Sequence, residues 1–207
     1  MTDYKIAVSC GKGMGIIENK VKSWADIVKK LTHHVEVAQK ENAGFFVGGA
    51  FSDDVRVDED LLCRSLLTLD IDKYKSTIDD LEFDLDLMGL GAFVAYSTYS
   101  HTSDKPRVRL VLPLSRDVSR DEYRQLSRSF CESYDPSIYD ECSYKPNQFM
   151  FYPSCAVGGE RWALSGEGVA LDVDKFLIKS VFDVVSDESD DDDFTRDLPL
   201  NMSDDEV

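Results

Sequence analysis

The sequence predicts an α+β domain, or an α/β domain with a mixed sheet, because strand-like and helix-like segments alternate along it. Apolar and polar residues alternate over 65–72 with the period of a β-strand. Short apolar segments at 92–97 and 108–112 have the length of buried strands. Ser119 and Glu122 then form a full capping box that opens a helix. Interleaving of this kind is typical of domains that mix helices and strands.

The N-terminal region is expected to begin with a strand at 4–10, which the glycines of 11–15 end. A glycine-rich segment with one lysine resembles a loop that holds phosphate. It lacks the Gly-Lys-Ser/Thr ending of a P-loop, and no clear helix follows it directly. A flexible turn is therefore the favoured interpretation.

A helix is predicted after Ser23, which has the spacing of a capping box with Asp26. A second short helix is expected to follow Thr32. Its adjacent histidines, His33 and His34, would point about 100° apart on a helix, which is a poor arrangement for sharing one metal ion. Both are expected on the surface.

The strand at 65–72 separates two sets of side chains. Leu67, Leu69 and Ile71 share one face, whereas Leu66, Thr68, Asp70 and Asp72 share the other. Two further helices are expected, one from Ser76 (with Asp79 in its cap) to about Met88 and one from Ser119 to about Cys131. The other expected strands are at 92–97, 108–112, 148–152 and 161–164, with a strand or loop at 44–51. Pro113 and Pro153 are expected to end the strands at 108–112 and 148–152.

The charge is distributed unevenly along the 207 residues. The chain has 40 acidic and 23 basic residues and a net charge of −17, of which −10 lies in 183–207. This block of like charge predicts a domain at 1–182 and a disordered acidic linker at 183–207. No apolar run approaches the ~20 residues of a membrane span, and no secretion signal is visible. A cytoplasmic location and no membrane contact are expected.

The five cysteines are scattered and lack a C-x-x-C pair. A disulfide framework is not expected without an export signal. Cys131, Cys142 and Cys155 could be considered as zinc ligands, but they lack the paired spacing of a structural site.

Two aspartates offer the first candidate site. Asp70 and Asp72 project from the same strand face and would repel each other unless a cation lay between them. Carboxylate oxygens suit Mg²⁺ or Mn²⁺. A strand end that runs into solvent is the alternative. Asp140 could complete a three-carboxylate site, or it could stabilise a turn, as Asp135 could.

Hydroxyl groups and a histidine follow the predicted strand at 92–97. Ser100 and His101 lie there, and Arg107 and Arg109 are in phase on the next strand. Hydroxyls, an imidazole and two guanidinium groups together can bind an oxyanion or a phosphate. A polar loop whose arginines balance nearby acids is the alternative.

Arginines recur every fourth residue after the third of these strands. They are Arg116, Arg120, Arg124 and Arg128, and the last three share one helix face. Such a row can follow a nucleic-acid backbone. Nearby acids such as Asp121 could instead pair with it and form a solvated, salt-bridged face.

In this order and spacing, the motifs resemble the archaeo-eukaryotic primase superfamily, in the primase-polymerase form that phages and plasmids carry. The similarity covers about residues 60–165. It rests on Leu-Thr-Leu-Asp-Ile-Asp ending at Asp72, on Tyr-Ser-Thr-Tyr-Ser-His-Thr around His101, on Arg-Val-Arg-Leu-Val-Leu-Pro-Leu from Arg107, and on the stretch from Asp140 to Met-Phe-Tyr-Pro-Ser ending at Ser154.

The resemblance implies a domain with an RRM-like sheet packed on an N-terminal α/β module, and a site for two Mg²⁺ or Mn²⁺ ions. The implied metal ligands and catalytic residues are Asp70, Asp72 and Asp140, with His101 also catalytic. The residues implied for the nucleotide are Ser100, His101, Arg107 and Arg109. The candidates for nucleic acid, Arg120, Arg124 and Arg128, come from the arginine spacing and not from the resemblance.

The implied function is a metal-dependent nucleotidyltransferase, a DNA primase or primase-polymerase that makes or extends primers during phage or plasmid replication in the host cytosol. Its partners would be a DNA template and primer, nucleoside triphosphates and a helicase domain, C-terminal or separate. Two alternatives stay open. One is a catalytically weakened nucleic-acid-binding replication domain, favoured by Gln148 where relatives often have arginine. The other is a metal-dependent nuclease that uses the same acids.

Overall fold

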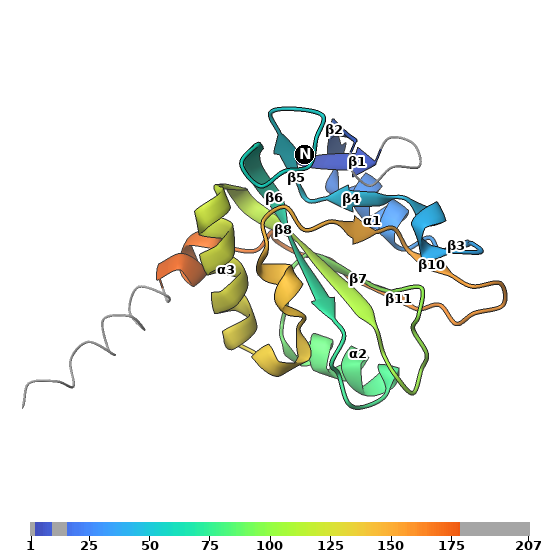
Figure 1. The fold of residues 1–207 in the computed structure, drawn as a ribbon. Helices are drawn as coiled ribbons and strands as arrows, with labels where there is room; N and C mark the ends of the chain where they lie inside the picture. Colours follow the sequence, from blue (N-terminus) through green and yellow to red (C-terminus); the bar gives the residue numbers. More distant parts are fainter. Residues whose placement is uncertain (1–2, 10–15, 179–207) are drawn as a thin grey trace, which may run out of the picture.

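The structure is a computed structural model that describes residues 3–9 and 16–178. Its N-terminal part is built on an antiparallel sheet with the strand order β2-β1-β4-β9 (Figure 1). The strands are β1 (Asp3–Ser9), β2 (Ile17–Ser23), β4 (Phe45–Val47) and β9 (Met150–Phe151). Because β9 follows β4 by about a hundred residues, this sheet joins distant parts of the chain.

A larger sheet with the order β11-β7-β8-β6-β5 forms the centre of the molecule. Its strands are β5 (Gly49–Phe51), β6 (Leu61–Ile71), β7 (Phe93–Ser97), β8 (Val108–Val118) and β11 (Ala163–Gly166). All its pairings are antiparallel. Strand β8 lies between β6 and β7, so β6, the following helix and β7 form a split βαβ unit.

Helices cover one face of this sheet and the N-terminal sheet covers the other. Helices α2 (Ile78–Leu87) and α3 (Arg120–Glu132) pack on the face that carries Leu67, Leu69 and Ile71. On the opposite face, Leu66 packs with Phe46 of β4 and with residues of α1 (Trp24–Leu31). The central sheet is therefore buried on both faces, and Asp70 belongs to a strand that other elements cover on both sides.

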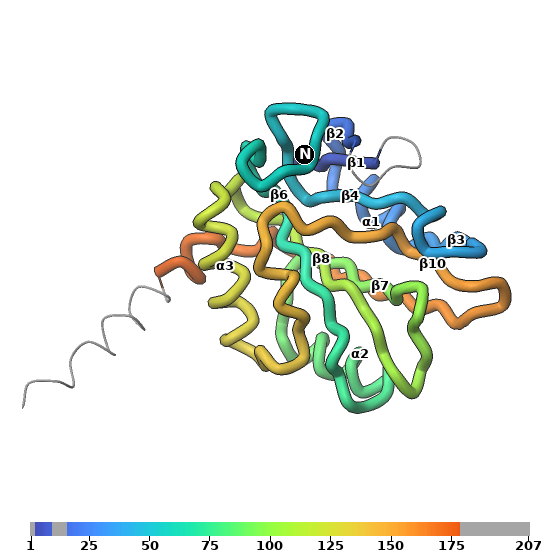
Figure 2. Tube along the Cα trace, viewed as in Figure 1, coloured from blue at the N-terminus to red at the C-terminus, as the bar shows by residue number. Residues whose placement is uncertain are grey.

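The segment after α3 returns along β6 before it reaches β9 (Figure 2). It contains the short 3₁₀ helices η2 (Pro136–Ile138) and η3 (Glu141–Tyr144). Tyr139 forms an isolated β-bridge with Ile71, and the N–H of Lys73 donates to the carbonyl of Ile138 at 3.2 Å. These contacts hold the segment against the end of β6.

Most of the expected elements are confirmed, and so is the α+β class. Among the described strands, the one parallel pair is β3 (Val35–Glu36) with β10 (Ser154–Cys155). The expectation of a mixed main sheet is thus wrong, because antiparallel neighbours build both larger sheets. Strand β2 was not expected; it pairs with β1 over its whole length.

Three local predictions are wrong. The short α-helix expected directly after Thr32 does not form. Thr32 is the C-cap of α1, and the next helical turn is the 3₁₀ helix η1 (Lys40–Ala43). Helix α2 begins one residue later than expected, because Thr77 and Asp80 form its capping box. Pro113 does not end β8, since it lies opposite Leu66, where the pairing register shifts and a backbone donor is dispensable.

Three expectations concern segments outside the described residues. They are the turn at 11–15, the acidic linker at 183–207 and the domain boundary between 182 and 183. In the part of the chain that is described, no helix is long and apolar enough to cross a membrane.

Candidate active site

Asp70 lies near the C-terminal end of β6 and Asp72 just after it, and each faces an arginine at or just before the start of β8. Asp70 is opposite Arg109 in the β6–β8 ladder, and Arg109 Nε lies 3.2 Å from Asp70 Oδ1. Arg107 Nη1 donates to Asp72 Oδ2 at 2.7 Å. The two acids and the two arginines predicted from the sequence therefore come together as two ion pairs.

The environment of Asp70 differs from that of Asp72. Asp70 is 8% exposed, and burial raises the pKa of its carboxyl group, although the positive charge of Arg109 acts in the opposite direction. The negative charges of Asp72 and Asp140 also raise the pKa of Asp70. The pKa of Asp70 is thus set by burial first and by the charges around it second.

The loop that carries Asp140 is fixed beside Asp70. The N–H of Asp140 donates to the Asp70 carbonyl at 2.9 Å, and Ser143 Oγ accepts from the Asp70 N–H at 2.8 Å. The Asp140 carboxylate caps its own 3₁₀ turn, where Oδ1 accepts from the Cys142 N–H at 2.8 Å. Hydrogen bonds from Cys142 lower the pKa of Asp140. Asp140 therefore has the turn role that the sequence offered as one alternative, and its role as a metal ligand stays a prediction.

His101 is 5% exposed and is oriented by the backbone of Arg107. The Arg107 N–H donates to His101 Nδ1 at 3.3 Å. In a neutral imidazole the other nitrogen, Nε2, then carries the proton. Burial lowers the pKa of His101, which favours this neutral form.

A cavity of about 160 Å³ opens between the two sheets beside these groups. The sequence-predicted residues that line it are Ser100, Asp72, Arg107 and Arg109. Asp70 and His101 are not part of its wall, although Asp70 pairs with Arg109 and His101 accepts from the Arg107 N–H. Asp140 lines a separate pocket, together with Arg124 and Arg128 of α3. The predicted residues therefore do not all face one cavity.

Four polar residues of this cavity were not predicted as site residues. Lys40 comes from η1 in the N-terminal part, and Thr98, Tyr99 and Ser154 carry hydroxyl groups. The last three lie in the motifs that carry the resemblance, so that signal was visible. Nothing in the sequence around Lys40 indicates that it lies beside residues of β6 and β8.

His34 is a further residue that was placed wrongly. It is half-buried, and its Nε2 lies 2.9 Å from Ser97 Oγ and 3.0 Å from the Ser97 carbonyl oxygen. Burial lowers the pKa of His34. His34 therefore bonds to the last residue of β7, four residues before His101.

The arginine row is largely paired with acids. Arg124 lies 2.6 Å from Asp58 and 2.7 Å from Asp121, and Arg120 lies 3.7 Å from Asp58. Arg128 stacks 4.8 Å from the centre of the Tyr144 ring. These contacts favour the salt-bridged face over an open track for a nucleic-acid backbone.

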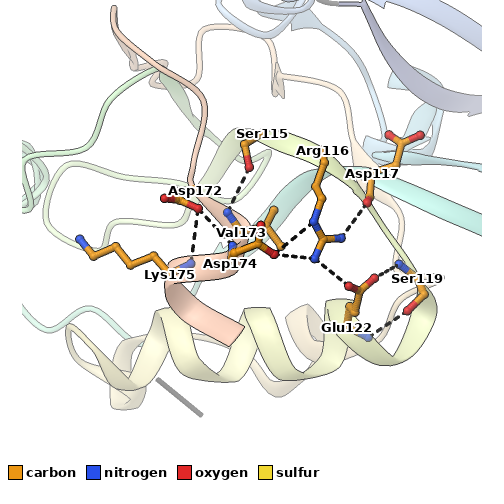
Figure 3. A network of polar contacts seen from close by, with 9 residues as sticks. All are labelled: Ser115, Arg116, Asp117, Ser119, Glu122, Asp172, Val173, Asp174 and Lys175. Carbon is orange, nitrogen blue, oxygen red and sulfur yellow. Dashed lines mark hydrogen bonds and ion pairs between the residues drawn. The ribbon is translucent and has the colours of Figure 1, made fainter. Parts of the chain in front are cut away.

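Arg116, the first member of the row, belongs to a separate polar network (Figure 3). Its guanidinium group donates to Glu122 at 2.8 Å and to Asp174 at 2.7 Å. Glu122 also accepts from the Ser119 N–H at the start of α3. The network joins the end of β8, the first turn of α3 and the helical residues 173–178.

The acids fit a partial metal site. Within the described residues, no group of three or more His, Cys, Asp or Glu side chains is arranged to hold a metal ion. Mg²⁺, however, is usually held by one or two carboxylates together with substrate phosphates and water, not by a complete protein cage. Asp72 beside the cavity and its near neighbour Asp70 match that donor set.

Comparison with known proteins identifies the family. A family model described as the VapE N-terminal domain matches residues 2–189. No curated protein matches the chain. Among solved structures, the AEP domain of the cyanophage S-2L primase-polymerase is similar with a TM-score of 0.48 at 12% identity, covering 86% of this chain and 88% of that chain.

The catalytic domain of primase Repb′ in complex with initiator DNA is similar with a TM-score of 0.42 at 14% identity, covering 92% of this chain and 91% of that chain. Each of these two structures is of a primase domain. The family match extends over most of the chain, and the chain therefore belongs to the VapE N-terminal domain family.

Proposed function

We propose that this domain is a primase-like nucleotidyltransferase that makes or extends primers on a DNA template. One observation carries the proposal. Two neighbouring acids, Asp70 and Asp72, lie with Arg107 and Arg109 at the end of one sheet, beside a cavity that also presents Lys40. Acids for a divalent cation thus lie next to cations for a triphosphate, which is the pair of functions that nucleotidyl transfer requires.

Each group has a role that follows from its position. Asp70 and Asp72 would hold Mg²⁺ or Mn²⁺, and we propose Asp140, whose N–H donates to the Asp70 carbonyl, as a third ligand. A bound ion supplies charge stabilisation for phosphate oxygens. Lys40 and Arg109 face the cavity and would bind the triphosphate by charge-assisted hydrogen bonds.

The neutral groups complete this nucleotide site. Ser100, Thr98 and Ser154 offer hydroxyl donors in the cavity wall. His101 would donate from Nε2 to a phosphate oxygen, because Nδ1 is already occupied by the Arg107 N–H. This neutral donor adds a hydrogen bond without adding charge to a site that already has several cations.

Primer extension tests the proposal directly. Asp72→Asn keeps the size of the side chain and removes its charge, so incorporation of nucleotides on a primed single-stranded template with Mn²⁺ should be lost. Asp174→Asn is the matched control, because Asp174 also pairs with an arginine but lies in the network around Arg116. Extension by Asp72→Asn at the wild-type rate would refute the assignment. Shortening of a labelled strand instead of extension would identify the nuclease alternative.

A second candidate is a catalytically weakened domain that binds nucleic acid in replication. It is favoured by the ion pairs that already neutralise Asp70 and Asp72, and by Gln148 in place of the arginine of relatives. Calorimetry with Mn²⁺ and a nucleoside triphosphate separates the two, since this candidate predicts no coupled binding of metal and nucleotide.

The remaining expectations about partners and location stay predictions. DNA as template and primer follows from the proposed reaction, and its path over the surface is open because the arginine row is largely paired. A helicase partner, a phage or plasmid setting and a cytoplasmic location rest on the family resemblance alone.

A further inference from the structure

The two arginines of the candidate site differ in how firmly they are held. Arg109 has a side chain that is 13% exposed; its Nε lies 3.2 Å from Asp70 as an ion pair, and its Nη1 donates to the Phe151 carbonyl at 3.1 Å. The side chain of Arg107 is 30% exposed, and among the described residues its hydrogen bond goes to Asp72 alone.

The backbone of Arg107 is nevertheless fixed. Its N–H donates to His101 Nδ1 at 3.3 Å, and its carbonyl accepts from the Thr98 N–H at 2.8 Å. The side chain therefore starts from a fixed point and ends in a half-exposed ion pair at the wall of the cavity. Such a side chain can change partner without any change in the fold.

Asp72 and the cavity offer Arg107 two competing partners. A divalent cation at Asp72 would take the carboxylate that Arg107 now contacts, and two positive charges on one carboxylate repel each other. A triphosphate in the cavity would offer Arg107 phosphate oxygens instead, to which guanidinium groups bind well. Lys40 and Arg109 line the same cavity and attract the same anion.

We propose that Arg107 is an exchangeable counter-ion, which neutralises Asp72 in the nucleotide-free domain and transfers to the triphosphate when metal and nucleotide bind together. This inference rests on the proposed function. Arg107 then couples the two ligands, because a bound metal ion releases Arg107 for the triphosphate and a bound triphosphate releases Asp72 for the metal ion. Arg109, which is buried and held by a backbone carbonyl, stays in place as the permanent partner of Asp70.

The exchange has a signature that a simple supporting role does not have. Removing the Arg107 charge should strengthen binding of the metal alone, because Asp72 loses its competitor, and should weaken binding of the nucleotide alone. By thermodynamic linkage, the factor by which each ligand improves binding of the other must also fall. A general loosening of the site would weaken both ligands.

The experiment measures Mn²⁺ binding by electron paramagnetic resonance and binding of a non-hydrolysable ATP or dATP analogue by calorimetry, each alone and together, on the full chain. Arg107→Gln should bind Mn²⁺ alone about fivefold more tightly, the factor that a half-exposed ion pair of about 1 kcal/mol implies. It should bind the analogue alone, in EDTA, severalfold more weakly. Arg107→Lys keeps the charge and should lie between this variant and the wild type.

Arg116→Gln is the matched control, since Arg116 is a half-exposed arginine that pairs with acids away from the cavity. It should leave both affinities unchanged. Unchanged or weaker Mn²⁺ binding by a folded Arg107→Gln would overturn the exchange, as would a parallel loss of both ligands. If the exchange is overturned in this way but the wild type still binds Mn²⁺ and the analogue with strong coupling, the proposed function still holds. If the wild type binds neither ligand, both proposals fail.

Discussion

Arg64 provides the sharpest test of how the fold supports the candidate site. Its side chain is completely buried, and no carboxylate among the described residues pairs with it. Nη1 donates to the Pro146 carbonyl at 2.6 Å, and Nη2 donates to Thr68 Oγ1 at 2.7 Å. The guanidinium group also lies 4.0 Å from the centre of the Tyr123 ring. Arg64 thereby ties the loop after Asp140 to β6.

The magnitude of an Arg64→Met change follows from the groups left behind. Arg64 also donates to the carbonyls of Gly48 and Leu66, at 3.1 Å each. Gly48 keeps two backbone donors, so the loss falls mainly on Pro146, Leu66 and Thr68. Each buried acceptor without a donor costs about 1–3 kcal/mol, and relief of the buried charge offsets part of this. We expect a net loss of about 3 kcal/mol.

Thermal unfolding measures this loss. For a protein of this size, about 3 kcal/mol corresponds to a decrease in Tm of roughly 6–12 °C. Arg161→Met is the matched control, because Arg161 pairs with Glu36 at the surface and should contribute less than about 1 kcal/mol. If Arg64→Met melts within ~2 °C of the wild type, the buried hydrogen bonds do not stabilise the loop as the geometry implies.

Three further changes test other parts of the structure. Gly49→Ala would place Cβ 2.1 Å from the Cys63 carbonyl oxygen, so the urea midpoint should fall by an amount equivalent to more than about 2 kcal/mol. Ser119→Ala removes the capping box of α3 and should cost about 1 kcal/mol in the same assay; an unchanged midpoint would contradict the cap. Burial lowers the pKa of His34 and of His101 below the usual 6.5, so the unfolded chain takes up protons first as the pH falls. Stability should therefore decrease below about pH 6.5, and a His34→Gln/His101→Gln variant should show a flatter decrease of Tm with pH.

Local physical rules explain why much of the fold could be predicted. The alternation of Leu67, Leu69 and Ile71 identified β6, and the capping box of Ser119 identified the start of α3. Both signals act within a few residues of the chain. The prediction that Pro113 ends β8 was wrong for a non-local reason, because the missing N–H lies at a register shift opposite β6.

The candidate site could be predicted only in part. Asp70 and Arg109 were found because each lies in a strand whose phase is visible in the sequence, and the ladder then places them opposite each other. Lys40 was missed because it approaches the cavity from another sheet, and η1 carries no periodic pattern that indicates its direction.

The sequence by itself determined the α+β class, the positions of most strands and helices, and the identity of the acids and arginines at the end of β6. These depend on short-range periodicity and on caps, which involve neighbours along the chain. Only the tertiary structure decided that Arg107 and Arg109 neutralise Asp70 and Asp72, that acids occupy most of the arginine row, and that Lys40 joins the cavity. The reason is physical: charges pair according to distance in space, and strand pairing sets that distance between residues far apart in sequence.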